Sequence, residues 1–503
     1  MLLFKKFEWC EDEILYIVNA GTVQAYGSLT NTVLMEHNNL AIHHYSKSFR
    51  GFSAMLTPEQ AQQLADKDLV VSVFQSKMNM FHTTHSWEFL GTDSAQQYNQ
   101  MPMESTSNTI VGVIDKGIWP ESKSFNDKGL GPVPKKFKGE CVTGEHFRLA
   151  NCNRKIIGVR FYLKGFEEES GPLESFNLPF LRSARDGDGH GTHTASTIAG
   201  SIVANVRLFG MARGTARGGA PSARLAIYKA CWFDMCSEAD IHSALDDAIS
   251  DGVDILSISI GPDPHQPSHF ENAILIGAFH AFQRGILASA SAGNSAFPGT
   301  ATNVAPWILT VAASSVDREF HSIVYLGNSK VLKGFSLNPI KMETYYGLIA
   351  GSVAAAPGVT AKNARNPVGK ISPTITVLNI KPAPEMVVFS SMGPNIITPD
   401  IIKPNITGPG LNILAAWSPV VTTATAEQSV DYNIISSASL SCPHVSAVAA
   451  IVKSYQPSWS PAAIMSAIMT TGKLFYTIMS DNYKFTYVFD WTKSMDYHSN
   501  GPR

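Results

Sequence analysis

The sequence contains no apolar run long enough to cross a membrane. A spanning helix needs about 20 apolar residues, and the stretches around Ile255 and Leu287 are shorter and are interrupted by Ser, Asp or Gly. The first residues, from Met1 to Lys6, are followed by four acidic residues before any apolar segment forms, which excludes a secretory signal at this position. The sequence therefore predicts a soluble chain without a membrane partner.

An excess of charge of either sign is also missing. The 503 residues include 39 Lys and Arg against 41 Asp and Glu, so there is no basic surface for nucleic acid and no polybasic segment for a membrane. The composition is 44% hydrophobic and 16% charged, which is typical of a globular protein. We therefore expect a large buried core and no nucleic-acid partner.

Cysteines are few, and none occurs in the CxxC doublets of a zinc site. Two pairs stand close in sequence, Cys141 with Cys152 and Cys231 with Cys236. Each pair either closes a small loop as a disulfide or remains reduced and buried, and the sequence leaves both possibilities open. Cys10 and Cys442 are left over, and the small, apolar surroundings of Cys442 predict a buried free thiol.

Residues 14–83 have the pattern of a separate β-α-β unit. Apolar runs predict strands at Ile14 to Val18, Phe49 to Leu56 and Val70 to Phe74. Between the last two lies the capping box Thr57-Pro58-Glu59-Gln60, which predicts a helix continuing through Ala65.

From about residue 108 the pattern becomes α/β, with short apolar strands ending in glycine and alternating with amphipathic helices. Strands are predicted at 109–114, 253–260 and 286–291, and helices at 237–250 and 271–284, the first with Ser237 as its cap and Asp251-Gly252 as its stop. Right-handed crossovers then predict a doubly wound parallel sheet with helices on both faces and a site at the strand ends. Residues 336–386 predict an irregular connection, and no structure is predicted from about Tyr476 onward.

Two polar residues stand where such a site would form. Asp115 directly follows the strand 109–114, so its carboxylate is expected at the carboxyl end of that strand. His190 lies in Asp186 to Ala195, where flanking glycines permit close approach of a substrate and a helix runs toward Gly200. His190 is the candidate general base, whereas a turn or a helix cap is the simpler interpretation of Asp115 alone.

Two further segments carry candidate residues for acyl transfer. Ser439 precedes an apolar helix through Val445 to Tyr455, whose N-terminal N–H groups favour developing negative charge on a nucleophile. Asn294 follows a strand end and could donate its amide N–H to an oxyanion. Capping serines and a turn-forming asparagine are the simpler interpretations.

Other chemistries fit the sequence less well. His190 and His193 are three residues apart, but the H-E-x-x-H arrangement of zinc peptidases is absent, so no metal is expected. The G-x-S-x-G motif of α/β-hydrolases is missing around Ser439, which argues against a lipase or esterase of that fold.

The four segments occur in the chain order Asp, His, Asn, Ser, which differs from the order His, Asp, Ser of chymotrypsin. Their local motifs resemble those of the plant cucumisin-like subtilases, and the likeness extends from about residue 14 to about residue 472. The matching segments are Asp115 to Ser122, Ser183 to His193, Phe389 to Asn395, Ser441 to Val445 and Trp459 to Ile464.

The resemblance implies a serine endopeptidase with a subtilisin-like fold, in which Asp115, His190 and Ser439 form a catalytic triad and Asn294 binds the oxyanion. It implies that Ser257, Ser259 and Gly261 lie on an edge strand that binds substrate by β-augmentation. Its expected partners are protein or peptide substrates and its own propeptide. No cofactor is implied, and the protein is expected to be an extracellular monomer.

The resemblance also divides the chain. Residues 14–83 would be an inhibitory, ferredoxin-like propeptide cleaved near His82-Thr83-Thr84, 84–475 the catalytic domain, and 476–503 an unassigned tail. The protease-associated insertion, the C-terminal fibronectin-like domain and the secretion signal of the family are not found. On this basis the chain is expected to be a truncated member.

Three departures from the family pattern bear on activity. The nucleophile motif Gly-Thr-Ser-Met appears here as Ser437-Ala438-Ser439-Leu440. If the glycine provides a positive φ, the change costs about 1–2 kcal/mol; if it provides clearance, the loss falls on substrate binding. Lys116 replaces Thr, with its side chain expected to point away from Asp115. Asn405-Ile406-Thr407 forms a glycosylation sequon in a segment expected to be packed.

These departures define the alternative to an active endopeptidase. The alternative is a catalytically impaired relative that binds peptides or propeptides, and the change at Ser437-Ala438 is the feature that favours it. Restoring Gly and Thr at these two positions is expected to create activity if the alternative holds.

Overall fold

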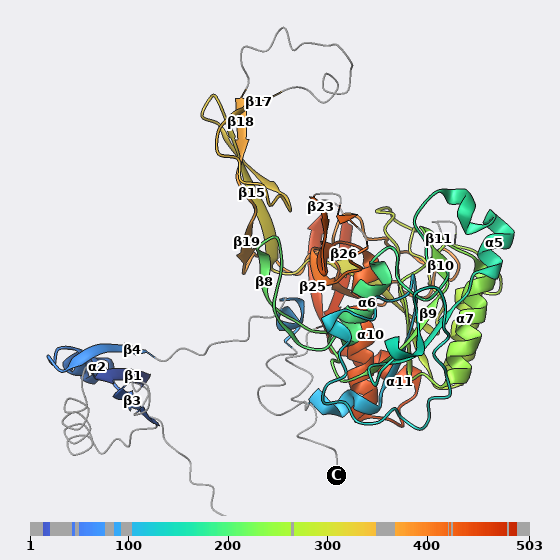
Figure 1. Ribbon diagram of the computed structural model, residues 1–503, viewed down its shortest axis with the longest axis horizontal. Coiled ribbons are helices and arrows are strands. Elements are labelled where there is room, and N and C mark those ends of the chain that lie inside the picture. Colours follow the sequence, from blue (N-terminus) through green and yellow to red (C-terminus); the bar gives the residue numbers. More distant parts are fainter. Residues whose placement is uncertain are drawn as a thin grey trace, which may run out of the picture. The chain divides into compact units, whose positions relative to one another are not determined.

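A computed structural model describes residues 14–20, 43–45, 50–75, 85–91, 103–262, 266–348, 368–420, 422–423, 426–479 and 482–489. The chain divides into two compact units, Met1–Phe81 and His82–Arg503 (Figure 1). None of the helices within these ranges combines the length and apolar character needed to cross a bilayer.

The first unit is a four-stranded antiparallel sheet with one helix. The sheet order is β2-β3-β1-β4, and the elements are β1 (Ile14–Ala20), β2 (His43–Tyr45), β3 (Arg50–Leu56), α2 (Pro58–Ala65) and β4 (Val70–Gln75). The predicted capping box is confirmed, because the Thr57 N–H donates to Gln60 Oε1 at 2.9 Å and the Gln60 N–H donates to Thr57 Oγ1 at 3.3 Å. Buried Phe52, Leu56 and Leu64 form its core.

The second unit is built on a sheet whose described residues form nine strands in the order β25-β26-β20-β14-β13-β12-β5-β9-β6. All neighbouring pairs are parallel except the hairpin β25-β26. The strands are β5 (Ile110–Asp115), β6 (Ile156–Phe161), β9 (Arg224–Lys229), β12 (Ile255–Ile258), β13 (Leu287–Ser291), β14 (Ile308–Ser314), β20 (Ile406–Pro409), β25 (Gly472–Met479) and β26 (Asn482–Phe489).

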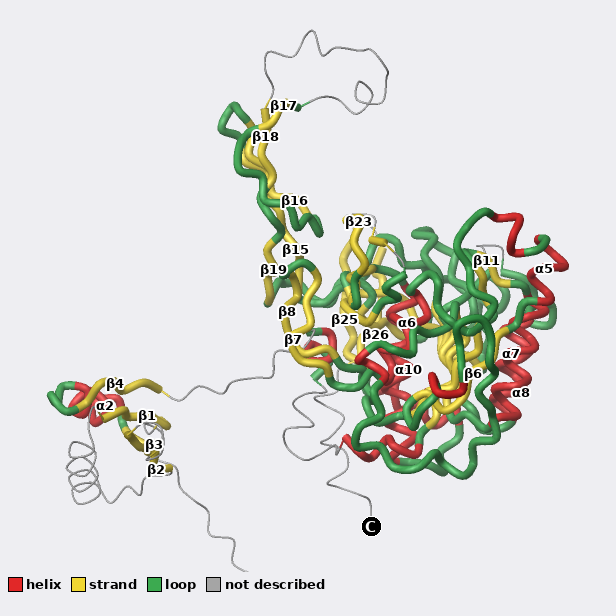
Figure 2. Tube along the Cα trace, in the orientation of Figure 1, coloured by secondary structure: helices red, strands yellow, loops and turns green. Residues whose placement is uncertain are grey.

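Helices cover both faces of this sheet, as the sequence predicts (Figure 2). Ile110 and Ile114 of β5 share a core with α7 (Glu238–Asp251) and α8 (Ala273–Gln283). Val111 and Val113, which alternate with them, share the opposite core with three helices, α6 (His190–Ala199), α10 (Ala438–Tyr455) and α11 (Pro461–Thr470). Each fully buried Val or Ile stabilises the fold by about 1.5–3 kcal/mol. Because β5 is buried on both faces, this packing holds the strand and its last residue, Asp115, in position.

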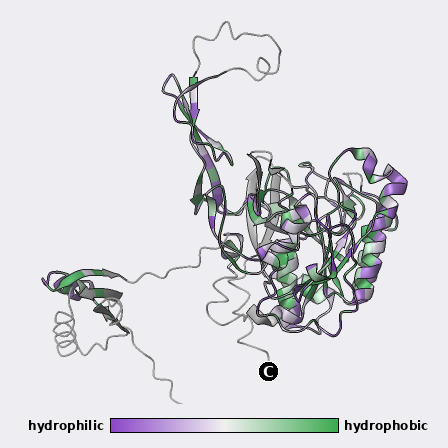
Figure 3. Cartoon of the chain, in the orientation of Figure 1, coloured by the Kyte–Doolittle hydropathy of each residue, from purple (hydrophilic) through white to green (hydrophobic). Residues whose placement is uncertain are grey.

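The boundaries of α7 show which local signals hold. Gly252 adopts the left-handed conformation with φ 83° and ends the helix, as predicted. Ser237 is the N-cap residue, as predicted, but its hydroxyl makes no capping hydrogen bond and donates instead to Glu169 Oε1 at 2.9 Å. The outward side of α7 is hydrophilic, with His242 and Asp246 exposed (Figure 3).

Residues 336–386 were predicted to be irregular, and among the described residues this was wrong for three short strands, β17 (Tyr346–Gly347), β18 (Val368–Ile371) and β19 (Ile375–Leu378). β15 (Arg318–Leu326), which precedes this segment, pairs antiparallel with β18, with β19 and with β16 (Val331–Phe335), and β17 pairs with β18. Many side chains of this sheet are exposed, so its strands lack the apolar alternation that reveals a half-buried strand.

The sequence predicts no structure for the C-terminal tail from about Tyr476. Residues as far as Phe489 form the hairpin β25-β26, and β26 lies beside β20 at the end of the large sheet. Aromatic and β-branched residues are frequent in both strands, which is the propensity signal that could have identified them. Residues from 490 onward lie outside the described ranges.

Shorter elements complete the second unit. They are α3 (Ser86–Phe89), α5 (Lys164–Ser170), β7 (Val203–Leu208), β8 (Met211–Ala216), β10 (Cys231–Trp232), β11 (Met235–Cys236), β21 (Ile413–Ala416), β22 (Thr422–Thr423), β23 (Ala426–Ser429) and β24 (Tyr432–Ile435), together with 3-10 turns at Met103–Asn108, Lys123–Phe125, Leu149–Asn151 and Leu173–Phe176.

Both candidate cysteine pairs are disulfides. Cys141 bonds to Cys152, and Cys231 bonds to Cys236, its direct partner across the β10-β11 pair. Cys442 is a buried free thiol, as predicted, and burial raises its pKa. Cys10 lies outside the described residues.

Candidate active site

Three neighbouring strands end at one rim of the large sheet and carry candidate residues there. Asp115 is the last residue of β5, Ser259 follows β12, and Asn294 follows β13 by three residues. Because β5, β12 and β13 are adjacent and parallel, these ends are separated by roughly 5 Å from strand to strand. The predicted meeting of Asp115 and Asn294 at one edge of the sheet follows from this order.

The Asp115 carboxylate is buried and fully hydrogen-bonded. His190 Nδ1 lies 2.6 Å from Asp115 Oδ1, which also accepts the Lys116 N–H at 2.7 Å. Asp115 Oδ2 accepts the Thr194 hydroxyl at 2.9 Å. Since Thr194 is one turn after His190 on α6, one helix supplies both side chains to the carboxylate.

The charges of this pair are mutually stabilised. Burial raises the pKa of Asp115, but the His190 ring and the hydrogen bonds from Lys116 and Thr194 outweigh burial and leave that pKa below its ordinary value. Burial lowers the pKa of His190, but Asp115 outweighs it and raises the pKa above the ordinary value, with Lys116 acting in the opposite direction. Since Nδ1 faces the carboxylate, Nε2 is the ring nitrogen available for proton transfer.

The turn before α6 is organised by the buried side chain of Asp186. Its Oδ1 accepts the Gly189 N–H at 2.7 Å, and its Oδ2 accepts the Thr192 hydroxyl at 2.6 Å. Gly189 has φ 102°, and a Cβ there would collide with Trp417; one at Gly191 would collide with the Gly117 backbone. These glycines therefore permit close packing inside the protein, and their close approach to a substrate stays a prediction.

His193 has separate partners from His190. Its Nε2 lies 3.0 Å from the Ile413 carbonyl oxygen, and its ring meets Trp417 edge to face. Burial lowers its pKa to about 3, so His193 is neutral at physiological pH. This side chain belongs to the packing of α6 against β21.

Ser439 lies in the first turn of α10 and is tied to the end of β12. Its hydroxyl donates to the Ser259 carbonyl oxygen at 3.2 Å, and the Ser259 hydroxyl donates to the Ser439 carbonyl oxygen at 2.8 Å. Among the described residues, no hydrogen bond joins the Ser439 hydroxyl to His190. Their partners nevertheless stand at the ends of adjacent strands, because His190 contacts Asp115 of β5 and Ser439 contacts Ser259 after β12. A hydrogen bond between such a base and nucleophile often forms only when substrate is bound.

Asn294 contacts the same turn of α10. Its Oδ1 accepts the Ala438 N–H at 2.8 Å, and its Nδ2 donates to Ser437 Oγ at 2.9 Å. The Ser439 N–H donates to that same Ser437 oxygen at 3.0 Å. Two N–H donors therefore converge on one side-chain oxygen beside the candidate nucleophile.

The edge-strand prediction for Ser257 to Gly261 was wrong for its first part. Ser257 lies in β12, which pairs with β5 on one side and β13 on the other, and its side chain is buried against Ser446 and Cys442. β12 is therefore an inner strand, and the local sequence does not encode the order of strands in a sheet. Ser259 and Gly261 follow the end of β12 and remain candidates for contact with substrate.

The other two departures from the family pattern, Lys116 and Asn405, each bond to identified side chains or backbone groups. Lys116 Nζ lies 2.7 Å from Asp234 Oδ1 and 3.1 Å from Asp188 Oδ2, so two carboxylates hold its ammonium group. Asn405 is packed as expected, because its Oδ1 accepts the Thr310 N–H at 2.9 Å and the Lys403 ammonium at 2.8 Å. The sequon asparagine is thus engaged inside the protein.

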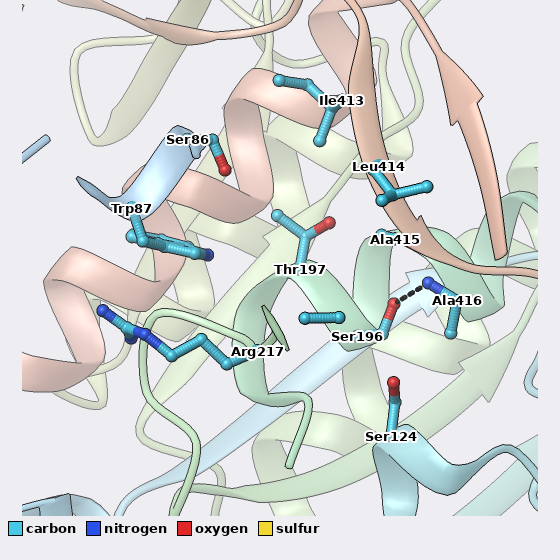
Figure 4. Close-up of a pocket in the computed structure, with 11 residues that line it drawn as sticks. Ser86, Trp87, Ser124, Ser196, Thr197, Arg217, Ile413, Leu414, Ala415 and Ala416 are labelled. Atoms are coloured by element: carbon cyan, nitrogen blue, oxygen red, sulfur yellow. Dashed lines mark hydrogen bonds between the residues drawn. The ribbon is translucent and has the colours of Figure 1, made fainter. Parts of the chain in front are cut away.

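A small pocket lies away from this rim. Trp87, Thr197, Arg217 and residues Ile413 to Ala416 line it, and the Ala416 N–H donates to Ser196 Oγ at 3.0 Å across its wall (Figure 4). None of the candidate residues at the strand ends lines this pocket. It is therefore separate from the candidate active site.

Comparison with known proteins identifies the family of each unit. Residues 106–486 match the model of the subtilase family, and residues 19–82 match the model of the peptidase inhibitor I9 family. The chain is 61% identical to the "Subtilisin-like serine-protease S" of Lotus japonicus, over 86% of this chain and 68% of that protein.

Further relatives are more distant. The "CO(2)-response secreted protease" of Arabidopsis thaliana is 39% identical over 91% of this chain and 71% of that protein. Among solved structures, Sphericase aligns with 77% of this chain and 92% of its own, at 19% identity and a TM-score of 0.42.

Proposed function

Because the chain belongs to the subtilase family of serine proteases, we propose that it is an endopeptidase with Asp115, His190 and Ser439 as its catalytic triad. The observation that carries the proposal is the hydrogen-bonded pair of Asp115 and His190 at the end of β5. The adjacent strand β12 ends beside it, and there the Ser439 hydroxyl donates to the Ser259 carbonyl oxygen. The buried Asp115 orients the ring and stabilises its positive charge, as acyl-transfer chemistry requires.

The proposed reaction proceeds through an acyl-enzyme. Ser439 Oγ attacks the peptide carbonyl carbon while His190 Nε2 accepts the hydroxyl proton, and the same imidazolium then protonates the leaving amine. A water molecule deprotonated by His190 hydrolyses the resulting ester and regenerates Ser439. Asn294 Nδ2 and the Ser439 N–H are the proposed donors to the oxyanion, since both converge on one position beside Ser439.

Substrate is proposed to bind in extended form beside the residues that follow β12. Main-chain groups of Ser259 and Gly261 would pair with the peptide by β-augmentation, so affinity would come largely from backbone hydrogen bonds. The substrate class is therefore protein or peptide.

The domain proposal assigns 14–83 to an inhibitory propeptide, 84–475 to the catalytic domain and 476–503 to a tail, of which residues as far as Phe489 continue the large sheet through β25 and β26. The match of residues 19–82 to an inhibitor family and the unit boundary after Phe81 support a cleavage near His82-Thr83-Thr84. Catalytic action outside the cell is proposed on two grounds: two disulfides suit an oxidising compartment, and one relative is named as a secreted protease.

Labelling with a fluorophosphonate tests the nucleophile. The folded, processed protein should react at Ser439, the Ser439→Ala variant should not, and the N-terminus of the mature form should lie near Thr84. A cooperative thermal transition in both proteins shows that they are folded. Absence of labelling in folded wild-type protein, or equal labelling of the Ser439→Ala variant, would contradict the proposed function.

A further inference from the structure

The side chain of Ser437 lies where the proposed reaction needs an empty position. Ser437 Oγ accepts hydrogen bonds from Asn294 Nδ2 at 2.9 Å and from the Ser439 N–H at 3.0 Å. These are the two donors proposed for the oxyanion, and their bonds have ordinary lengths and a common acceptor. A neutral hydroxyl oxygen of the protein therefore takes the place of the substrate oxygen.

Ser437 is the N-cap residue of α10, and the bond from the Ser439 N–H is its capping hydrogen bond. Its φ of −172° and ψ of 156° are extended, a conformation that any residue adopts. Its N–H donates to the Gly410 carbonyl oxygen at 2.9 Å, as a glycine at this position could. The consequence of having serine here thus lies in the side chain, and positive φ plays no part at this position.

We propose that the Ser437 hydroxyl occupies the oxyanion hole and must rotate out of it before the hole can stabilise a tetrahedral intermediate. This inference rests on the proposed function, because it assigns a self-inhibitory contact to that same site. In the tetrahedral intermediate the carbonyl oxygen becomes an anion and needs both N–H donors at once. The hydroxyl and the anion compete for one position, so each turnover bears the free-energy cost of displacing the hydroxyl.

The surroundings permit the rotation. Ser437 is partly exposed and Asn294 is exposed, so a second staggered χ1 position can place the hydroxyl in solvent. The contact is therefore reversible. It slows the proposed reaction but leaves the catalytic groups intact. A ligand that carries an anionic oxygen should compete better than one that carries a neutral carbonyl, since hydrogen bonds to charge are stronger.

Three variants at two neighbouring serines test the inference. Ser437→Gly removes the whole side chain, and Ser437→Ala removes only the hydroxyl. Ser436→Gly is the matched control, because Ser436 is an exposed neighbour whose hydroxyl accepts the Asn412 N–H at 2.9 Å, away from both donors. Rates of fluorophosphonate labelling, kcat/KM on a chromogenic peptide and inhibition by a peptide aldehyde are compared among them.

Both Ser437 variants should label faster and show higher kcat/KM, by roughly 10- to 100-fold, the effect of losing two competing hydrogen bonds. The aldehyde, which forms a tetrahedral adduct, should gain more affinity than KM improves. Ser436→Gly should remain within about twofold of wild type.

Two results would overturn the inference while leaving the proposed function intact. One is wild-type rates in both Ser437 variants. The other is acceleration in Ser437→Gly alone, because the Cβ and not the hydroxyl would then obstruct the site. Failure of every folded variant to label at Ser439 would instead remove the proposed function, and the inference with it.

Discussion

Two halves of the candidate site differ in how their hydrogen bonds are used. In the acid–base half, Asp115, His190 and Thr194 form a chain in which each polar group directs the next. In the oxyanion half, Asn294 and the Ser439 N–H both donate to Ser437. The first half leaves His190 Nε2 available for reaction, whereas in the second half both donors are already engaged.

The difference coincides with the sequence motifs. His190 and Thr194 stand in a segment that includes the family-like Gly189 to His193, whereas Ser437-Ala438 replaces the Gly-Thr expected before the nucleophile. On the proposed mechanism, the site retains its charge arrangement while the Ser437 hydroxyl occupies both proposed oxyanion donors. We therefore expect changes in the acid–base half to have the largest effect on the rate. Changes in the oxyanion half should alter how often its two N–H donors are free to bind substrate.

The largest effect is expected from breaking the acid–base half. Asp115→Asn places an amide against His190 Nδ1, which favours the wrong tautomer and removes the charge that stabilises the imidazolium. We expect kcat/KM on a chromogenic peptide to fall about 10⁴-fold. Asp400→Asn, which changes an exposed carboxylate, should have little effect. A loss of less than tenfold for Asp115→Asn would show that this half does not drive the reaction.

The next effect couples Asn294 to Ser437. With the hydroxyl removed by Ser437→Gly, Asn294→Ala should cost roughly 10²–10³-fold in kcat, the usual effect of losing one oxyanion donor. In the wild-type background the cost should be smaller, because the same substitution also weakens the competing hydroxyl contact. The four kcat values form a double-mutant cycle, and additivity within about twofold would show that the two side chains act independently.

The acid–base half could largely be foreseen from sequence. An apolar strand ending in Asp115 and a glycine-flanked His190 opening a helix are local signals, and local signals fix strand and helix ends. Thr194 was not identified from the sequence as a hydrogen-bond donor to Asp115, although its spacing of four residues from His190 places both on one helix face. That contact was within reach of sequence reasoning.

The oxyanion half could not be foreseen in the same way. Asn294 and Ser437 are 143 residues apart, and only the packing of α10 across β12 and β13 brings them together. The sequence revealed the Ser437 substitution but not the direction of its side chain. The same limit explains Ser257, since the order of strands in a sheet depends on contacts between distant segments.

A smaller effect should come from the support of Asp115. Thr194→Val removes the hydroxyl that donates to Asp115 Oδ2 and leaves that buried oxygen without this partner. We expect about a tenfold loss of kcat/KM, corresponding to about 1.4 kcal/mol. Thr197→Val is the control on the same helix, because Thr197 donates only to the His193 carbonyl oxygen. Equal losses in both variants, with equal falls in Tm, would indicate a structural effect of α6 alone.

The smallest effect is expected from Lys116→Thr, which tests whether Lys116 acts on His190 through its charge or by positioning neighbouring side chains. The Lys116 ammonium opposes the upward shift that Asp115 gives to the His190 pKa, so Lys116→Thr should raise that pKa further. In the proposed mechanism His190 must be neutral to accept the Ser439 proton, so activity falls as the pH drops through this pKa. The acid limb of kcat/KM should therefore move to higher pH in Lys116→Thr. Lys330→Thr, at an exposed position, should leave the limb in place. A uniform loss at every pH would instead mean that Lys116 acts by holding Asp188 and Asp234 in position, since a purely electrostatic effect disappears once His190 is fully deprotonated.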